Sequence, residues 1–213
     1  MTTDNLDERF RIAVVIGSVR SPRLADPLAA WLERELSAVD WVDLDMIDLA
    51  AVSLPMHELK PGGSAASPIA GRLADADGFV LLTPEYNHSF PAPLKNAIDW
   101  HFTEWAYKPV AFVGYGGSGG IRAVEHLRTV FPELRATTVR ESVLLPMAWE
   151  HLDAEGRFVP PPGTERALHA TMNELRTWAR ALRSLRRGQS GPGGREQEDR
   201  TGTARRTAVI LDR

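Results

Sequence analysis

The chain has 213 residues, of which 43% are hydrophobic, and a formal net charge of −3. This length suits one domain with a real core, and the near balance of charge argues against nucleic-acid or anionic-membrane binding. Because there is no cysteine, disulfides, thiolate catalysis and cysteine-bound metals are excluded. The polar start resembles no signal peptide, and no apolar run approaches the roughly 20 residues of a bilayer span. We therefore expect a soluble, cytoplasmic protein.

Short apolar segments alternate with helical patterns along most of the chain. Apolar runs predict buried strands, and apolar residues three or four apart predict helices. Strands are expected at 11–16, 41–49, 78–82 and 109–115, with a last strand in two pieces at 136–140 and 142–145. Helices are expected at 22–37, 68–75, 93–101, 121–131 and 164–187.

This alternation predicts an α/β fold. Right-handed crossovers require a parallel sheet with helices on both faces, and flavodoxin-like winding is one of the two common solutions. We expect one domain over residues 11–187, preceded by a flexible N-terminus over 1–10. Residues 188–213 are rich in Gly, Arg, Gln and acidic residues, a composition typical of a disordered tail.

The turn after the first strand, Gly17–Ser21, is a candidate phosphate site. Hydroxyl side chains, backbone N–H groups and a helix N-terminus attract anions, and the Arg20 guanidinium adds a planar charge suited to phosphate. Ser18, Arg20 and Ser21 are the candidate ligands, and Arg23 is a further candidate. The loop lacks the Gly-Lys-Ser/Thr of a triphosphate-binding loop. An ordinary turn with a solvated arginine is the alternative.

The segment Thr83–Trp100 is the most informative part of the chain. It follows the buried strand 78–82, and Pro91 and Pro93 mark the start of the next helix. Since ligands bind at the carboxyl ends of strands in open α/β sheets, this polar, ring-bearing loop predicts a site for a flat ligand with polar edges. Glu85 and His88 also admit acid–base work, and a polar surface turn is the simplest alternative.

A third loop, Gly114–Gly120, contains the pattern Gly-x-Gly-x-x-Gly, with Glu141 roughly 20 residues beyond. A dinucleotide fingerprint belongs in the first strand–helix turn of its fold, whereas three strand–helix units precede this loop. We therefore expect the glycines to serve close backbone approach to a flat ligand and tight helix–strand packing.

The six histidines have no spacing typical of metal ligands, so no metal site is expected. Two of them, His101 and His126, lie on predicted helices and are expected at a surface or an interface. The site is thus expected to depend on the three loops.

Together, the three loops resemble those of the NAD(P)H-dependent FMN reductases of the flavodoxin-like superfamily. The resemblance rests on residues 17–20, 84–89, 95–100 and 115–120 and covers about residues 11–185. It implies a flavodoxin-like three-layer sandwich whose five-stranded parallel sheet has the order 2-1-3-4-5. It also implies FMN contacts by three groups of residues: Ser18, Arg20 and Ser21; Pro84, Glu85, Tyr86, Asn87 and Ser89; and Gly116, Gly117 and Ser118.

The implied function is an FMN-dependent oxidoreductase that passes a hydride from NAD(P)H through bound FMN to free flavin, a quinone, an azo compound or a similar small acceptor. No side chain is expected to act as a catalytic acid or base, since the cofactor carries the reaction. A homodimer or homotetramer is implied. The glycine loop is one residue shorter than usual, which leaves the role of Ser118 open. The alternatives are an FMN-binding electron carrier or redox sensor, and a Rossmann-type dehydrogenase using Gly114–Gly119.

Overall fold

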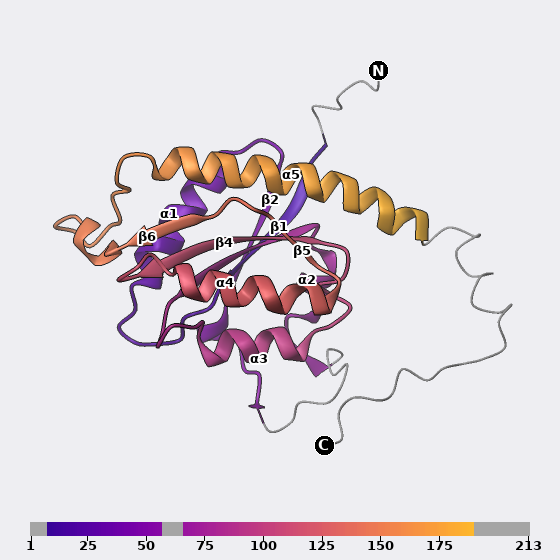
Figure 1. The fold of residues 1–213 in the computed structure, drawn as a ribbon, viewed down its shortest axis with the longest axis horizontal. Coiled ribbons are helices and arrows are strands. Elements are labelled where there is room, and N and C mark those ends of the chain that lie inside the picture. Colours follow the sequence, from indigo (N-terminus) through magenta and orange to yellow (C-terminus); the bar gives the residue numbers. More distant parts are fainter. Residues whose placement is uncertain (1–7, 57–65, 190–213) are drawn as a thin grey trace, which may run out of the picture.

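A computed structural model describes residues 8–56 and 66–189 and shows a parallel sheet between two helical layers (Figure 1). The strands are β1 (Phe10–Ile16), β2 (Val42–Asp48), β3 (Gly78–Pro84), β4 (Pro109–Gly116), β5 (Thr137–Thr138) and β6 (Val143–Pro146). They pair in the order β2-β1-β3-β4-β5, and β6 also pairs with β4. The expected order 2-1-3-4-5 is confirmed, although the sheet has six strands because the last one is divided. The expected N-terminal and C-terminal extensions lie largely outside the described residues.

The helices are α1 (Ala25–Ser37), α2 (Ala70–Asp75), α3 (Ala92–Trp100), α4 (Ile121–Val130) and α5 (Thr164–Gln189). The core is split by the sheet into two clusters. Ile12 and Val14 of β1 belong to the cluster of α1 and α5, whereas Ala13 and Val15 belong to that of α2, α3 and α4. Because successive strand residues point to opposite faces, the continuous apolar runs of the sequence reflect burial on both sides.

At the point where the last strand is divided, α5 contacts the backbone. β5 pairs with the start of β4 and β6 with its end. Between them, the backbone N–H groups of Arg140 and Glu141 donate to the Glu174 carboxylate of α5, at 3.0 and 2.9 Å. A side chain of the covering helix therefore satisfies the backbone where the ladder is interrupted.

The predicted start of α3 is confirmed, since Pro91 is its N-cap residue and Pro93 lies in its first turn. The predicted start of α1 at Pro22 is wrong, because the helix begins at Ala25. Arg23 accounts for the difference. Its guanidinium donates to the Ser18 carbonyl at 2.8 Å and to Asp48, so the residues after β1 form a longer turn before the helix begins.

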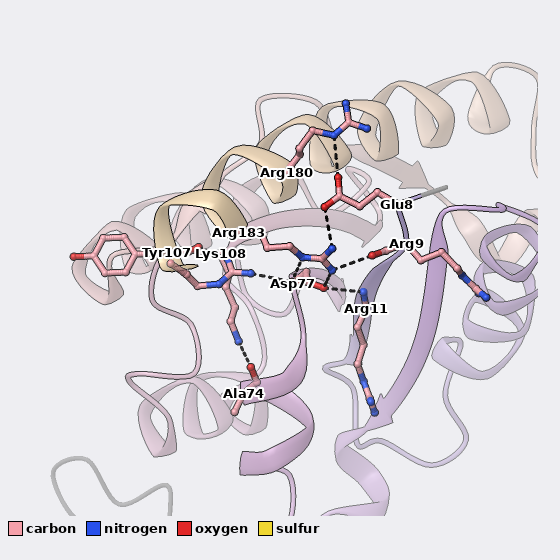
Figure 2. A network of polar contacts seen from close by, with 10 residues as sticks. Glu8, Arg9, Arg11, Ala74, Asp77, Tyr107, Lys108, Arg180 and Arg183 are labelled. Atoms are coloured by element: carbon pink, nitrogen blue, oxygen red, sulfur yellow. Dashed lines mark hydrogen bonds and ion pairs between the residues drawn. The ribbon is translucent and has the colours of Figure 1, made fainter. Parts of the chain in front are cut away.

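α5 is fastened to the amino ends of the strands by a polar network around Asp77, the residue before β3 (Figure 2). Asp77 accepts hydrogen bonds from Arg183 and Arg186 of α5 and from the backbone N–H of Arg11. Lys108, just before β4, donates to the carbonyls of Leu73 and Ala74 at 2.8 and 2.6 Å. The network lies at the amino ends of the strands, opposite the three candidate loops, so it supports the scaffold rather than the site.

His101 is buried within the chain, contrary to the expectation that it lies at a surface or an interface. Its ring nitrogens lie 2.6 Å from the Ala97 carbonyl and 2.7 Å from the Ser67 hydroxyl. Two polar partners thus satisfy the ring within the protein. His126 is exposed on α4, as expected. Over residues 8–56 and 66–189, no helix combines the length and apolar character of a membrane span.

Candidate functional site

The three candidate loops follow β1, β3 and β4, which are neighbours in the sheet (Figure 1). The register places Ile16 beside Leu82 and Pro84 beside Tyr115, so the three loops leave the sheet together at the carboxyl ends of the strands. A cavity of about 370 Å³ lies between them, within the size range of small-molecule sites. It is lined by Arg20, Pro22, Arg23, Leu24, Pro84, Glu85, Tyr86, Tyr115, Gly116, Gly117 and Trp149.

Tyr86 joins the turn after β1 to the loop after β3. Its hydroxyl lies 3.1 Å from the Ser18 hydroxyl, and Ser18 is only 1% exposed. The Arg20 guanidinium carbon lies 3.9 Å from the centre of the Tyr86 ring, a cation–π arrangement. The ring therefore fixes the relative position of the two loops and holds the Arg20 charge at the cavity.

Arg20 and Arg23 differ in whether a carboxylate pairs with the guanidinium group. Arg23 is held by Asp26 at 2.7 Å and by Asp48, and its hydrogen bond holds the pKa of the Asp48 carboxyl below its usual value. Arg20 forms no ion pair within the described residues. Arg20 is therefore the cation that an incoming anion can use, while Arg23 stabilises the turn.

The loop after β3 turns tightly at Asn87 and His88. Tyr86 and Ser89 exchange backbone hydrogen bonds of 2.8 and 3.0 Å, and both central residues have positive φ, 50° and 66°. This is the geometry of a two-residue hairpin turn, which Asn favours at its first position. Neither central N–H donates a hydrogen bond to the described residues, so both remain available to a ligand or water.

Glu85 connects this loop to the start of α4. Its backbone N–H donates to the Tyr115 carbonyl at 2.9 Å. Its carboxylate, 9% exposed, accepts from the backbone N–H and from a side-chain nitrogen of Arg122, at 3.0 and 2.8 Å. Burial opposes the charge, but the bonds from Arg122 hold the pKa of Glu85 below its usual value. A carboxylate so placed complements the helix N-terminus and positions the two walls of the cavity.

The glycine loop after β4 packs as tightly as expected. A Cβ on Gly120 would lie 2.6 Å from the Tyr115 nitrogen, and one on Gly114 would lie 2.8 Å from the Gly119 carbonyl oxygen. Gly116 has a φ of 145° and approaches Glu85, whereas Gly117 faces open space. Ser118 is exposed and its hydroxyl accepts from Arg122 at 3.3 Å. The outer glycines thus serve packing, and the middle ones form a smooth wall.

The structure gathers some of the expected residues at the cavity but not all of them. Arg20, Pro84, Glu85, Tyr86, Gly116 and Gly117 line it, and Ser18 adjoins it through Tyr86. Ser21, Asn87, Ser89 and Ser118 do not line it. The Ser89 hydroxyl instead lies 3.0 Å from a ring nitrogen of His126 on α4.

Two aromatic lining residues, Tyr115 and Trp149, were not predicted as site residues. The Tyr115 hydroxyl is buried near Ser18 but forms no hydrogen bond of good geometry with a described residue. Burial raises its pKa, and the Ser18 hydroxyl lowers it by a smaller amount. Tyr115 is near the end of β4, and Trp149 follows β6 by three residues. The rule that ligands meet the carboxyl ends of strands, applied to β6 as well, would have indicated Trp149.

These features fit FMN. Phosphate requires an uncompensated cation, which Arg20 provides at a turn before a helix, while the buried Ser18 of the same turn holds the Tyr86 hydroxyl. A flat ring requires a slot with close backbone walls, which the loops of Pro84 and Gly116 provide. The orphaned Tyr115 hydroxyl beside the cavity is a further polar group for a bound molecule to satisfy.

Comparison with known proteins agrees with this reading. Residues 10–150 match the family described as NADPH-dependent FMN reductase. An NAD(P)H-dependent FMN reductase of Schizosaccharomyces pombe is 36% identical over 152 residues, covering 64% of this chain and 74% of that protein. A 2-hydroxy-1,4-benzoquinone reductase of a Burkholderia species is 31% identical over 187 residues, covering 82% of this chain and 98% of that protein.

A solved structure supports the fold. The flavoenzyme NAD(P)H:(acceptor) oxidoreductase FerB from Paracoccus denitrificans matches with a TM-score of 0.52 at 23% identity. The match covers 82% of this chain and 98% of that one, and at this identity it bears on the fold alone.

The fold and the site define a flavodoxin-like oxidoreductase that uses FMN and NAD(P)H. More specifically, the chain belongs to the NADPH-dependent FMN reductase family. The dehydrogenase alternative would require a Rossmann strand order and a glycine fingerprint after the first strand. Here the order is β2-β1-β3-β4-β5, and the glycine loop follows β4.

Proposed function

We propose that the protein transfers electrons from NAD(P)H to a quinone, with FMN held in the cavity between the loops of β1, β3 and β4. The observation that carries the proposal is the unpaired Arg20 beside Ser18 and Tyr86, at a cavity whose other walls are Pro84 and Gly116. Such a site supplies both a positive charge that can bind a phosphate and a slot that can hold a planar ring.

Each loop has a separate role. Arg20, with Ser18 and Ser21 of the same turn, holds the phosphate by charge-assisted hydrogen bonds. Pro84, Glu85 and Tyr86 line one side of the ring, and Asn87, which lies outside the cavity lining, would donate to its polar edge through a backbone N–H that bonds to no described residue. Gly116 and Gly117 allow close approach on the other side, while Ser118 and Ser89 support the loops through Arg122 and His126.

The chemistry belongs to the cofactor, and the protein orients the reactants and excludes water. When bound, FMN accepts a hydride from the nicotinamide and passes the electrons on. For a quinone the balance is NAD(P)H, one proton and quinone giving NAD(P)⁺ and hydroquinone. Glu85 remains ionised through its bonds to Arg122 and holds the walls in place, so it serves as neither acid nor base.

A quinone is proposed as the acceptor because the Burkholderia relative is named for a benzoquinone substrate. Azo compounds and free flavin are further planar acceptors that the same slot would admit. We also propose that the protein works as a homodimer or homotetramer in the cytoplasm, and that residues 11–187 form one cofactor-binding domain.

Titration of the purified, flavin-free protein with FMN tests the site, and NAD(P)H consumption with a quinone tests the activity. We expect saturable quenching of FMN fluorescence, and nicotinamide oxidation that requires both FMN and the quinone. A protein that binds FMN but oxidises neither NADH nor NADPH would support the electron-carrier alternative. A protein that does not bind FMN would contradict the proposal altogether.

A further inference from the structure

Trp149 presents a large aromatic surface at the cavity without belonging to any of the three cofactor loops. It lines the cavity together with Arg20, Tyr86 and Gly117, yet it is 48% exposed. A single exposed apolar residue carries no information by itself, but an indole that is both half-exposed and part of a cavity lining offers a flat apolar surface to a bound molecule. Met147, two residues earlier, is also exposed, at 37%. Trp149 thus places an aromatic surface at the cavity, and Met147, which is outside the cavity lining, is exposed on the same turn.

The turn that carries Trp149 is held rigidly against the glycine loop. The backbone N–H of Met147 donates to the Gly116 carbonyl at 2.9 Å, and that of Glu150 donates to Met147 at 2.8 Å. Ala148 between them is fully buried, so it anchors the turn in the core. Met147 adopts a left-handed conformation with a φ of 50°. Such backbone strain in a residue other than glycine persists where the surrounding structure enforces it, as it often does at functional sites.

The segment after this turn is fixed as well. Val159 donates its backbone N–H to the His151 carbonyl at 2.8 Å, and Leu152 pairs with Phe158. The buried Phe158 ring meets Trp31 of α1 edge-on, with centroids 5.3 Å apart. The excursion from β6 to α5 is therefore anchored on both sides of Trp149, which preorganises the indole at the cavity mouth.

We infer that Trp149 is a specificity-determining residue that stacks on planar, conjugated electron acceptors and thereby favours them over compact inorganic ones. This inference rests on the proposed function, because it requires the acceptor to approach this cavity. The cofactor already has its charge from Arg20 and its walls from the loops of Pro84 and Gly116. The half-exposed indole is a flat apolar surface outside these loops, and aromatic rings bind one another in offset or edge-on arrangements.

The inference is tested with Trp149→Ala, Trp149→Phe and a matched control, Trp178→Ala, all loaded with FMN. Trp178 is 40% exposed on α5 and lies outside the cavity lining. Menadione, a bicyclic quinone, is the planar probe, and ferricyanide is the compact one. Binding of menadione to the oxidised protein is measured by calorimetry without nicotinamide, and its KM is measured with NADPH.

We expect Trp149→Ala to weaken menadione binding and raise its KM by about 3–10-fold, the effect of losing one aromatic stacking partner. Trp149→Phe should retain most of the binding. The rate with ferricyanide, the affinity for FMN and the behaviour of Trp178→Ala should not change.

Two results would overturn the inference. A parallel loss of FMN affinity in Trp149→Ala would make the indole part of the flavin site, and unchanged menadione binding would remove it from acceptor recognition. Both results require a wild-type protein that binds FMN and oxidises NADPH, so they are distinct from a failure of the proposed function, which appears in the wild type itself.

Discussion

Arg20 is the residue on which cofactor affinity should depend most. A charge-assisted bond to phosphate is worth about 1.5–3 kcal/mol, and no carboxylate among the described residues compensates Arg20. We expect Arg20→Ala to weaken FMN binding by about 10–150-fold, measured by fluorescence titration. Arg34→Ala on α1, which removes an exposed arginine beside Glu35, is the control and should bind FMN normally. Unchanged affinity in Arg20→Ala would remove this residue from the site.

Glu85 illustrates a positioning role. Glu85→Gln keeps the shape but removes the charge that receives two bonds from Arg122. Since Arg122 is half exposed, we expect a loss of only about 1 kcal/mol in the free energy of unfolding, with a few-fold weaker FMN binding. Glu125→Gln, which removes an exposed carboxylate from the same helix, is the control. Loss of activity with unchanged FMN affinity would instead favour acid–base work by Glu85.

At the scale of elements, α5 depends on Asp77 for its attachment to the sheet (Figure 2). Asp77→Asn leaves Arg183 and Arg186 without their shared anion, so we expect a loss of about 2–4 kcal/mol in the free energy of unfolding by urea. Asp43→Asn on β2 removes an exposed carboxylate and should change little.

The same network should depend on pH. Burial raises the pKa of Asp77, but the bonds from Arg183 and from the Arg11 backbone outweigh it, and the net pKa lies below its usual value of 3.8. The stabilisation is therefore present above 3.8 and is lost as pH falls through the lower, folded-state pKa. The difference in the free energy of unfolding between the wild type and Asp77→Asn should therefore shrink in this acid range. An advantage that stays constant with pH would contradict the assignment.

Lys108 should show a trend of the same sign, but at alkaline pH. Burial lowers its pKa from 10.5 to about 8. Between these values the unfolded chain binds more protons than the folded one, so this group makes stability rise with pH. In urea unfolding, Lys108→Met should lack this rise, whereas Lys95→Met, which removes an exposed lysine from α3, should retain it. Parallel profiles for wild type and Lys108→Met would contradict the prediction.

Most elements could be predicted because their residues act locally. The apolar runs of β1, β3 and β4 and the prolines at the start of α3 carry their own signal. The start of α1 could not be predicted, since it depends on Arg23 reaching Asp48, 25 residues away. His101 was misplaced for the same reason, because its burial depends on Ser67 from a distant loop.

The loops that form the site could be predicted, because their positions follow from where the strands end. The three loops were identified because each follows an apolar strand, and the sheet order brings them together. The pairing of Glu85 with Arg122 and the approach of Trp149 arise only from tertiary contacts. Sequence patterns thus indicated which loops matter, and the structure separates residues that can touch a ligand from residues that hold the loops.

At the scale of the whole molecule, the polar groups at the two ends of the strands have different roles. The amino ends carry the ion network of Asp77 and Lys108 that secures α5. The carboxyl ends carry the cavity, where Arg20 stacks on Tyr86 but forms no ion pair with a described residue, and where the buried Tyr115 hydroxyl forms no hydrogen bond with one. The site and the ion network that secures the scaffold therefore lie at opposite ends of the strands.

The central claim is that this cavity holds FMN between NAD(P)H and an acceptor, and anaerobic absorption spectroscopy of the FMN-loaded protein tests it most directly. We predict that NADPH or NADH bleaches the visible band of the bound flavin and that menadione, added afterwards, restores it. Arg20→Ala should show the change only at higher FMN concentrations. A flavin band that persists with both nicotinamides, or a protein that retains no FMN, would contradict the account.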